Sequence, residues 1–142
     1  MKIAIASDHG GLTLKNAIKK HLIELGHEVL DFGTNTEDSC DYPDFGRLAS
    51  NAVATGECER GIVVCTTGIG MSMVANKVKG VRCALCTSVD MAVMTRKHNN
   101  ANVLALGQKY VTVKLAKVIV DTFLTTEFEG GRHEIRVNKI EG

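Results

Sequence analysis

The sequence carries no excess of either charge and no long run of apolar residues. Its 17 Lys and Arg face 16 Asp and Glu, which gives a formal net charge of +1 and a pI of about 7.7. Proteins that bind nucleic acid usually show a basic excess, so we expect no nucleic-acid partner. No stretch approaches the roughly 18 apolar residues of a membrane-spanning helix, and Met1-Lys2 leads directly into an apolar strand rather than a signal peptide. We therefore expect a cytoplasmic protein with no membrane partner.

The sequence contains a single proline and no low-complexity segment. The single proline, Pro43, stands where a helix can begin, ahead of apolar residues at helical spacing. No linker, internal repeat or biased segment divides the chain. With 142 residues the chain is long enough to bury a substantial core, so we expect one domain that spans residues 1–142.

Cysteine is frequent, and its count is odd. The five cysteines are Cys40, Cys58, Cys65, Cys83 and Cys86. An odd number, with some members inside apolar strands, indicates reduced thiols in a reducing compartment. Cys83 and Cys86 form a C-x-x-C pair, but side chains three apart in a strand point to opposite faces. We therefore interpret this pair as structural and not as a disulfide or a metal site.

Apolar strands alternate with helical patterns along the chain. The predicted strands are Lys2–Ser7, His27–Phe32, Gly61–Cys65, Val81–Cys86 and Val103–Leu106. Helical patterns cover Leu12–Leu25, the stretch from Pro43, Met71–Lys77, Met91–His98, Val111–Leu124 and Arg132–Ile140. Near-continuous apolar strands separated by helices are typical of a parallel sheet covered on both faces. The sequence predicts an α/β fold: a single doubly wound, Rossmann-like domain with a five-stranded parallel sheet and helices on both faces.

The most informative segment is the turn that follows the third predicted strand. The strand ends at Cys65, and the segment Thr66-Thr67-Gly68-Ile69-Gly70 leads into a helix. Backbone amides at a helix start attract anions and favour a thiolate, so this turn suits chemistry through a negatively charged intermediate. The alternative is a tight turn that carries a small buried cysteine. In doubly wound sheets ligands bind beyond the carboxyl ends of the strands, where Asp8-His9-Gly10-Gly11 also lies. If the first and third strands are neighbours, this loop and the Cys65 turn converge at one edge of the sheet.

Two further polar groups stand far from this turn. His98-Asn99 ends the fourth predicted helix, while Arg132 and Arg136 share one face of the last helix, a spacing that suits a phosphate. A crossover helix returns to the opposite sheet edge, so His98 should lie roughly 15 Å from Cys65, at about 1.5 Å per residue over about ten residues. If the two act together, one must come from another subunit. We expect a homodimer with shared active sites, which could pair into a tetramer.

Together these motifs resemble the ribose-5-phosphate isomerase type B family, which includes galactose-6-phosphate isomerase subunits and allose-6-phosphate isomerases. The resemblance covers essentially the whole chain, in a shared order and spacing of motifs. It is carried by Ser7-Asp8-His9-Gly10-Gly11, Asp41-Tyr42-Pro43-Asp44, Cys65-Thr66-Thr67-Gly68-Ile69-Gly70-Met71-Ser72, Ala75-Asn76-Lys77, His98-Asn99-Asn100-Ala101-Asn102-Val103 and Glu129-Gly130-Gly131-Arg132-His133.

The resemblance implies a phosphorylated sugar as substrate and no metal or other cofactor. It makes Cys65 the base that moves a proton between C1 and C2, with Thr67 assisting and turn amides holding the enediolate. It assigns opening of the sugar ring to His98 with help from Asp8. The remaining residues that it places at the substrate are His9, Tyr42, Gly68, Ile69, Gly70, Met71, Ser72, Asn99, Arg132 and Arg136. Within this set, the phosphate is assigned to His9 and the two arginines.

The chain departs from the family pattern at two positions. Thr66 stands where members commonly have glycine, and Lys109 where some have an arginine that contributes to the phosphate site. Galactose-6-phosphate isomerase subunits commonly lack either the cysteine or the His-Asn pair. This chain keeps both, which favours a self-sufficient isomerase. The resemblance favours ribose 5-phosphate over allose or galactose 6-phosphate.

Each site residue also has a purely structural interpretation. Asp8 could cap a helix, His98 could stabilise a helix end, and the two arginines could be solvated. His21, His27 and His133 are interpreted as surface residues. A flavodoxin-like nucleotide-binding module is another class, but its G-x-G-x-x-G motif is absent. A third class of function is a thiol hydrolase that uses Cys65 with a histidine base.

Overall fold

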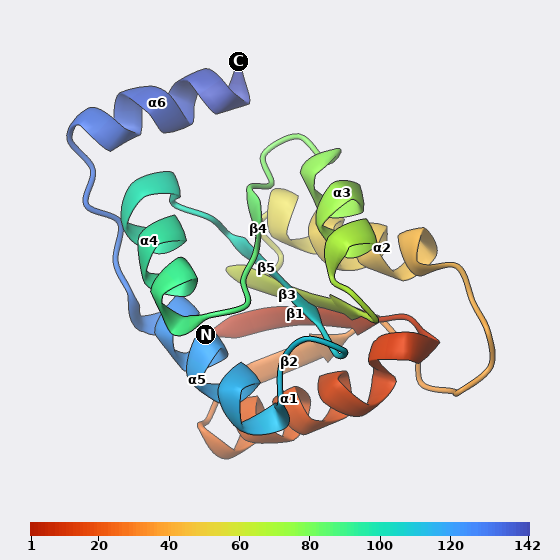
Figure 1. The fold of residues 1–142 in the computed structure, drawn as a ribbon. Helices are drawn as coiled ribbons and strands as arrows, with labels where there is room; N and C mark the ends of the chain where they lie inside the picture. The colour runs from red at the N-terminus through yellow and green to blue at the C-terminus, as the bar shows by residue number, and fades with distance from the viewer.

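The computed structural model describes residues 1–142 and contains one five-stranded parallel sheet. The strand order is β2-β1-β3-β5-β4, with every neighbouring pair parallel. The strands are β1 (Lys2–Ser7), β2 (Glu28–Asp31), β3 (Arg60–Cys65), β4 (Cys83–Leu85) and β5 (Val103–Gly107). The doubly wound α/β fold predicted from the sequence is confirmed (Figure 1).

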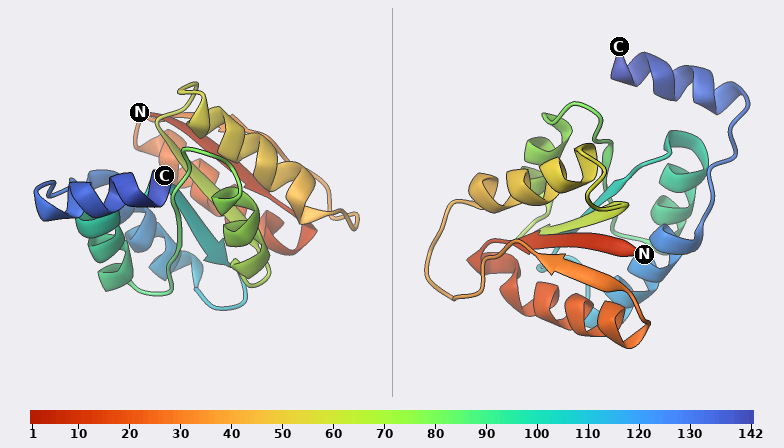
Figure 2. Two further views of the ribbon diagram at one scale, coloured as in Figure 1. Left: turned by 90° about the horizontal axis from the view of Figure 1, so that it is seen from above. Right: turned by 180° about the vertical axis from the view of Figure 1, so that it is seen from behind.

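The helices cover both faces of this sheet (Figure 2). A short 3-10 helix, η1 (His9–Gly11), precedes the α-helices, which are α1 (Leu12–Glu24), α2 (Tyr42–Ala54), α3 (Ile69–Asn76), α4 (Val89–Asn99), α5 (Val113–Thr125) and α6 (Arg132–Glu141). Helices α1, α4 and α5 contribute to one apolar cluster, and α2 and α3 contribute to the other. The last helix, α6, lies outside these layers against α4. No helix of the structure is both long and apolar enough to cross a membrane.

Predicted and observed elements agree in type and order, with differences at their ends. The fourth strand was predicted over Val81–Cys86 and is shorter, because the Arg82 N–H donates to the Asn102 side chain at 2.8 Å instead of to a strand. The first helix ends at Glu24, and Leu25 is 54% exposed rather than part of its apolar face. The ends of strands and helices are thus set by hydrogen bonds, which the apolar pattern of the sequence does not predict.

The structural interpretation of the C-x-x-C pair is confirmed. Cys83 packs against the apolar cluster under α2 and α3, whereas Cys86 belongs to the cluster on the opposite face of the sheet. All five cysteines are free. Burial raises the pKa of Cys86 to about 11 and that of Cys83 well above its ordinary range, so both thiols stay protonated at neutral pH.

A buried lysine ties α1 to the loop that follows β2. The Lys15 side chain is 0% exposed, and its Nζ lies 2.9 Å from the Asp31 carboxylate and 2.9 Å from Asn35 Oδ1. It also donates to the carbonyl of Thr34. The same loop pairs with the end of β1, since the Thr34 N–H donates to the Ser7 carbonyl at 2.6 Å. Lys15 therefore fixes a segment that lies directly beside the residue preceding Asp8.

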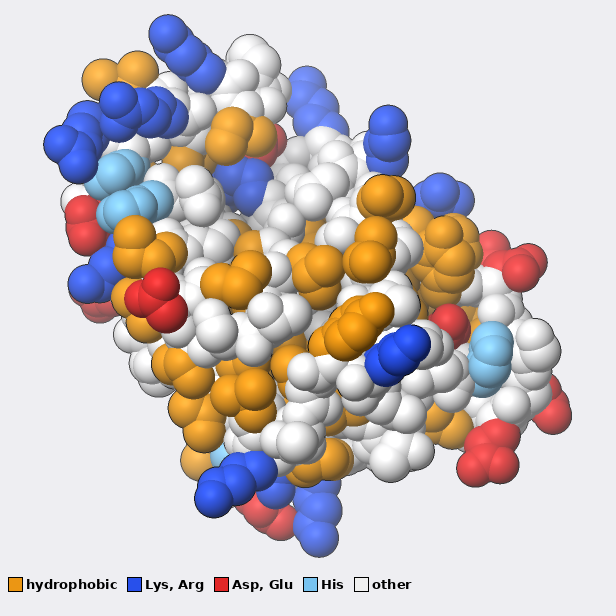
Figure 3. Space-filling model, in the orientation of Figure 1, with side chains coloured by type: hydrophobic (Ala, Val, Ile, Leu, Met, Phe, Trp, Pro, Cys, Tyr) orange, Lys and Arg blue, Asp and Glu red, His pale blue; other side chains and the backbone are white.

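Several apolar side chains remain exposed on one side of the molecule. On the face shown in Figure 3, hydrophobic side chains gather over α3 and α4. The exposed apolar residues of these two helices are Ile69, Met73, Met91 and Met94, which are 40% to 64% exposed. A cluster of this kind is typical of a surface that another protein molecule covers.

Candidate active site

The carboxyl edge of the sheet holds the principal cavity of the protein. β1 pairs with both β2 and β3, so the chain winds in opposite directions from β1, and the loops after β1 and β3 face a common crevice. Its volume is about 420 Å³. The residues that line it are Asp8, Tyr42, Cys65, Thr66, Thr67, Ile69, Gly70 and Met73. The convergence of the Asp8 and Cys65 loops predicted from the sequence is therefore confirmed.

Cys65 ends β3 and is followed by a tight turn into α3. The residue is only 5% exposed, and its Sγ accepts a hydrogen bond from the Gly68 N–H at 3.1 Å. Gly68 has φ of +77°, and a Cβ there would lie 2.5 Å from Leu85 Cδ1, so the turn requires glycine. The sulfur thus lies beside an amide and at a helix start, both of which stabilise negative charge.

The first turn of α3 is held by its own side chains. The Ile69 N–H donates to Thr67 Oγ1 at 3.3 Å, and the Ser72 hydroxyl donates to the Ile69 carbonyl at 2.7 Å. Met71 is fully buried, and neither it nor Ser72 lines the cavity. Met73, which the sequence did not single out, lines it instead. Any contact of Met71 with a ligand would therefore come from its backbone amide, because the first amides of a helix have no partner within it.

Asp8 both caps a helix and faces the cavity. Its Oδ1 accepts a hydrogen bond from the Gly11 N–H at 3.1 Å, so the capping interpretation holds for η1, yet the residue also lines the cavity. The neighbouring His9 accepts, through Nδ1, a hydrogen bond from the Cys40 N–H at 3.2 Å. No spacing in the sequence indicated the contact between His9 and Cys40, because the loop after β2 brings them together.

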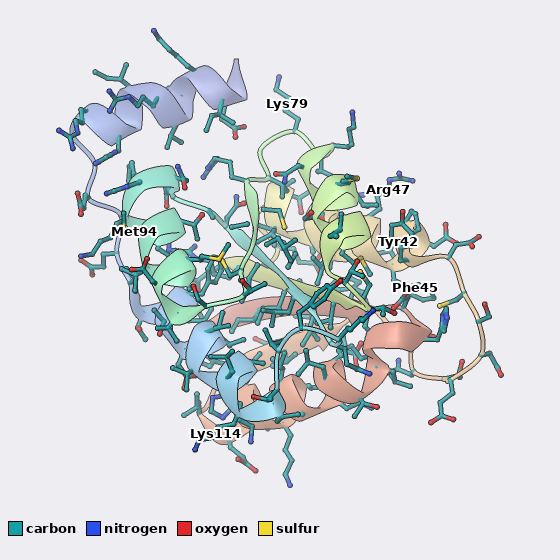
Figure 4. The ribbon with its side chains drawn as sticks, viewed as in Figure 1. Tyr42, Phe45, Arg47, Lys79, Met94 and Lys114 are labelled. Carbon is teal, nitrogen blue, oxygen red and sulfur yellow. The ribbon has the colours of Figure 1, made fainter.

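Tyr42, the first residue of α2, forms a side wall of the cavity next to α3 (Figure 4). A Cβ on Gly70 would lie 2.5 Å from the Tyr42 ring, so the ring rests on the backbone of α3. A larger residue at position 70 would displace the ring and change the width of the cavity. Glycine at this position therefore shapes the site without contributing a side chain.

The remaining predicted site residues lie elsewhere in the chain. α4 ends beside the start of β5, whereas Cys65 pairs with Gly107 at the opposite end of that strand. Accordingly His98, Asn99, Arg132 and Arg136 are not among the cavity residues. Asn99 lines a separate cavity of about 260 Å³ that reaches Ile140 of α6. One chain thus divides the predicted residues into two groups at opposite edges of the sheet.

The interpretation of His133 as a surface residue is wrong. Its ring stacks on that of His98, with centroids 4.1 Å apart and an interplanar angle of 11°. Its side chain is only 12% exposed, and Nε2 lies 3.5 Å from a carboxylate oxygen of Glu129. His21 is also partly buried, 2.8 Å from Asp121 of α5. Both contacts join helices that are distant in sequence, so spacing alone does not reveal them.

His98, Glu129 and His133 bring three potential metal ligands within 4.8 Å of one another. An imidazole nitrogen binds a metal in the plane of its ring, about 2.0 Å away. Two rings stacked at 11° have separate, nearly parallel planes, and one ion cannot lie in both. The arrangement therefore favours a stacked pair over a metal centre.

Arg96 anchors the end of α4 and was not singled out from the sequence. It is 3% exposed and donates to the carbonyls of Thr126 at 3.1 Å and Ala101 at 2.6 Å. Burial, together with the nearby charges of Arg60 and Arg82, lowers the pKa of Arg96 to about 10, so it remains charged at neutral pH. Arg96 thus joins α4 to the segment that leads into α6.

Comparison with known proteins identifies the family. Residues 3–140 match the family described as Ribose/Galactose Isomerase. The chain belongs to this family. It is 46% identical to ribose-5-phosphate isomerase B of Escherichia coli over 139 residues, 98% of this chain and 93% of the relative. The structure of ribose-5-phosphate isomerase B from Clostridium thermocellum superposes with a TM-score of 0.98 at 57% identity, covering 99% of this chain and 95% of that one. The Mycoplasma genitalium enzyme with bound ribulose-5-phosphate has a TM-score of 0.95 at 48% identity, covering 99% and 93%.

The two departures of this Ribose/Galactose Isomerase family member lie side by side. Thr66 lines the cavity, and a Cβ on Gly10 would collide with its hydroxyl. The Lys109 N–H donates to the Thr66 carbonyl at 2.9 Å, so the loop after β5 is hydrogen-bonded to the loop after β3. A change of bulk at Thr66 therefore acts directly on the space available to a ligand.

Proposed function

We propose that this isomerase interconverts ribose 5-phosphate and ribulose 5-phosphate through an enediolate, as one domain spanning residues 1–142 and without a metal. The Cys65 sulfur, which accepts the Gly68 N–H inside the cavity, is the observation that carries the proposal. The relative from Mycoplasma genitalium, solved with ribulose-5-phosphate, supports the choice of substrate. Five free cysteines favour a reducing compartment, and we propose the cytoplasm. The test is conversion of ribose 5-phosphate to ribulose 5-phosphate in the presence of a chelator.

The reaction needs a base for a carbon-bound proton and donors for an oxyanion. In the proposed step the Cys65 thiolate removes the proton from C2 of the open aldose, and the electron pair moves onto the carbonyl oxygen at C1. The same proton then returns to C1 while the proton of the C2 hydroxyl is transferred to O1, which leaves the ketose with no net gain or loss of protons. Amides of the turn from Gly68 to Ser72 would stabilise the enediolate, and Thr67 would assist proton movement at the oxygens.

Ring opening and phosphate binding need the second group of residues. We propose that His98, with Asp8, opens the furanose, that His9, Arg132 and Arg136 bind the phosphate, and that Asn99 lines the site. Within one chain His98 and Cys65 belong to opposite edges of the sheet. A homodimer in which each site takes residues from both subunits reconciles these positions. The exposed apolar residues of α3 and α4 support such an interface, and two of them, Ile69 and Met73 of α3, also line the cavity.

A shared site predicts complementation between two inactive variants. Cys65→Ala and His98→Ala chains, denatured together and refolded as a mixture, form heterodimers in which one of the two sites is intact. Random pairing should restore about a quarter of the wild-type activity. Measurement of ribulose 5-phosphate formation by the mixture checks this. Each variant refolded alone is the control, and a mixture as inactive as its components would mean that each site lies within one chain.

A hexose 6-phosphate is the second candidate substrate, since the family also covers galactose isomerases. Thr66 adds bulk to the cavity wall where glycine would leave room. We therefore expect Thr66→Gly to raise kcat/KM for allose 6-phosphate relative to ribose 5-phosphate by about tenfold, the lower end of the discrimination that one methylene gives in a pocket. Competition between the two substrates measures this ratio. An unchanged ratio would exclude Thr66 as a determinant of substrate length.

A further inference from the structure

His133 is the closest aromatic neighbour of His98. The two rings lie parallel, with centroids 4.1 Å apart, and join the last turn of α4 to the first turn of α6. We propose that His133 is a positioning residue that holds the His98 imidazole in the orientation needed to open the sugar ring. This inference rests on the ring-opening role proposed for His98. Stacked aromatic pairs favour a fixed separation and tilt, so a ring on one side limits rotation of the other.

The segment that carries His133 is tied to the two residues of α4 that directly precede His98. The Glu129 N–H donates to the Lys97 carbonyl at 3.1 Å, one residue before His98. Arg96 reaches the Thr126 carbonyl on the preceding turn. These bonds fix the start of the segment against α4. The His133 ring therefore reaches His98 from a backbone that is itself held in place.

The far end of α6 is attached to the same helix end. Arg82 pairs with Glu141 at 3.0 Å and donates to the carbonyls of Asn99 at 3.2 Å and Asn100 at 2.8 Å. Val137, in the middle of α6, is buried. With both ends of α6 joined to the last turn of α4, His133 cannot move away from His98 without breaking several contacts. A rigid support of this kind is what positions a functional side chain.

The surroundings of the pair lower the pKa of His133. The titratable and charged groups that face it are His98 of α4, Glu129 of the preceding loop, and Arg132 and Arg136 of α6. Contact with the neighbouring ring removes water and lowers the pKa of His133, the charges of His98 and the two arginines lower it further, and Glu129 acts in the opposite direction. The lowered pKa of His133 favours an uncharged ring in the stack at neutral pH.

The test separates ring opening from isomerisation. In a Cys65→Ala background the isomerisation base is absent, and ring opening can be followed by itself. NMR saturation transfer measures it as enzyme-catalysed exchange between the α and β furanose anomers of ribose 5-phosphate. We expect His133→Ala to slow this exchange roughly tenfold, in line with the strength of an aromatic pair. His133→Phe, which keeps a flat ring, should retain at least about half of the rate.

Control variants separate the positioning role of His133 from the ring-opening role of His98. His98→Ala should abolish the catalysed exchange, and His27→Ala, a histidine near the N-terminal amine, should not change it. Full exchange in His98→Ala would overturn the ring-opening role of His98. If His98→Ala loses the catalysed exchange while His133→Ala keeps the full rate, the role of His133 alone is overturned. The same holds if His133→Phe exchanges the anomers as slowly as His133→Ala. Circular dichroism of each variant checks folding, and the Phe variant keeps the test decisive if His133→Ala does not fold.

Discussion

Cys65→Ala is expected to lower kcat for ribose 5-phosphate isomerisation by about a thousandfold, the usual value of a positioned general base. The sulfur lies in the cavity and accepts the Gly68 N–H, while alanine leaves no group there that could take the C2 proton. Since a buried Cys→Ala change removes one atom, the fold should persist. Steady-state turnover in the presence of chelator, with circular dichroism of the same sample, measures both effects.

Cys86→Ala is the matched control for this experiment. Cys86 is another free, buried cysteine, but it belongs to the apolar cluster on the far side of the sheet from Cys65. Burial raises its pKa to about 11, so its thiol is protonated at neutral pH and supplies no base. This variant should keep wild-type turnover. A Cys65→Ala enzyme that retained more than about a tenth of the wild-type rate would mean that another group is the base.

Asp31→Asn is expected to destabilise the fold by about 3 kcal/mol, because it leaves the Lys15 ammonium buried without its counter-charge. The Lys15 side chain is 0% exposed and that of Asp31 is 9% exposed, so water cannot replace the lost carboxylate. Urea denaturation followed by circular dichroism measures the change. Asp121→Asn is the comparison, because it removes the carboxylate that pairs with His21 and that is 45% exposed. It should lower the free energy of unfolding by less than about 1 kcal/mol. Equal effects of the two variants would contradict the importance of burial.

The effect of Asp31→Asn should also depend on pH. Burial acts to raise the pKa of Asp31, but hydrogen bonds from Lys15 and Gly33 and the charge of Lys15 hold it below its ordinary value. A folded-state pKa below the unfolded value of about 3.9 adds stability above that pH. This stability is lost as the pH falls through the lowered pKa. The difference in unfolding free energy between wild type and Asp31→Asn should therefore shrink below about pH 4.

Much of the fold follows from local sequence. A strand of a parallel sheet is buried on both faces, so β1, β3 and β5 read as apolar runs whatever lies beside them. The pairing of β1 with β3, by contrast, does not follow from the apolar pattern. The predicted site required these strands to be neighbours, and the structure shows that they are. That β5 lies between β3 and β4 was not predicted at all, since the hydrophobic pattern does not encode strand order.

The cysteine turn was predictable for the same local reason. The end of β3, the glycine with positive φ and the start of α3 lie within a few residues of one another, so one stretch of sequence specifies them. The contacts of Lys15, Arg96 and His133 were not predicted. Each of these side chains meets a group from a different element, and a lone polar residue beside an apolar face usually remains solvated.

By itself, the sequence determined the alternation of strands and helices, the thiol at a helix start and the motif order of its family, because these depend on neighbours along the chain. Only the tertiary structure decided the strand order, the burial of Lys15 and the stack of His133 on His98. Those features depend on how separate elements pack. Packing is set by the whole core at once, and no single segment carries that information.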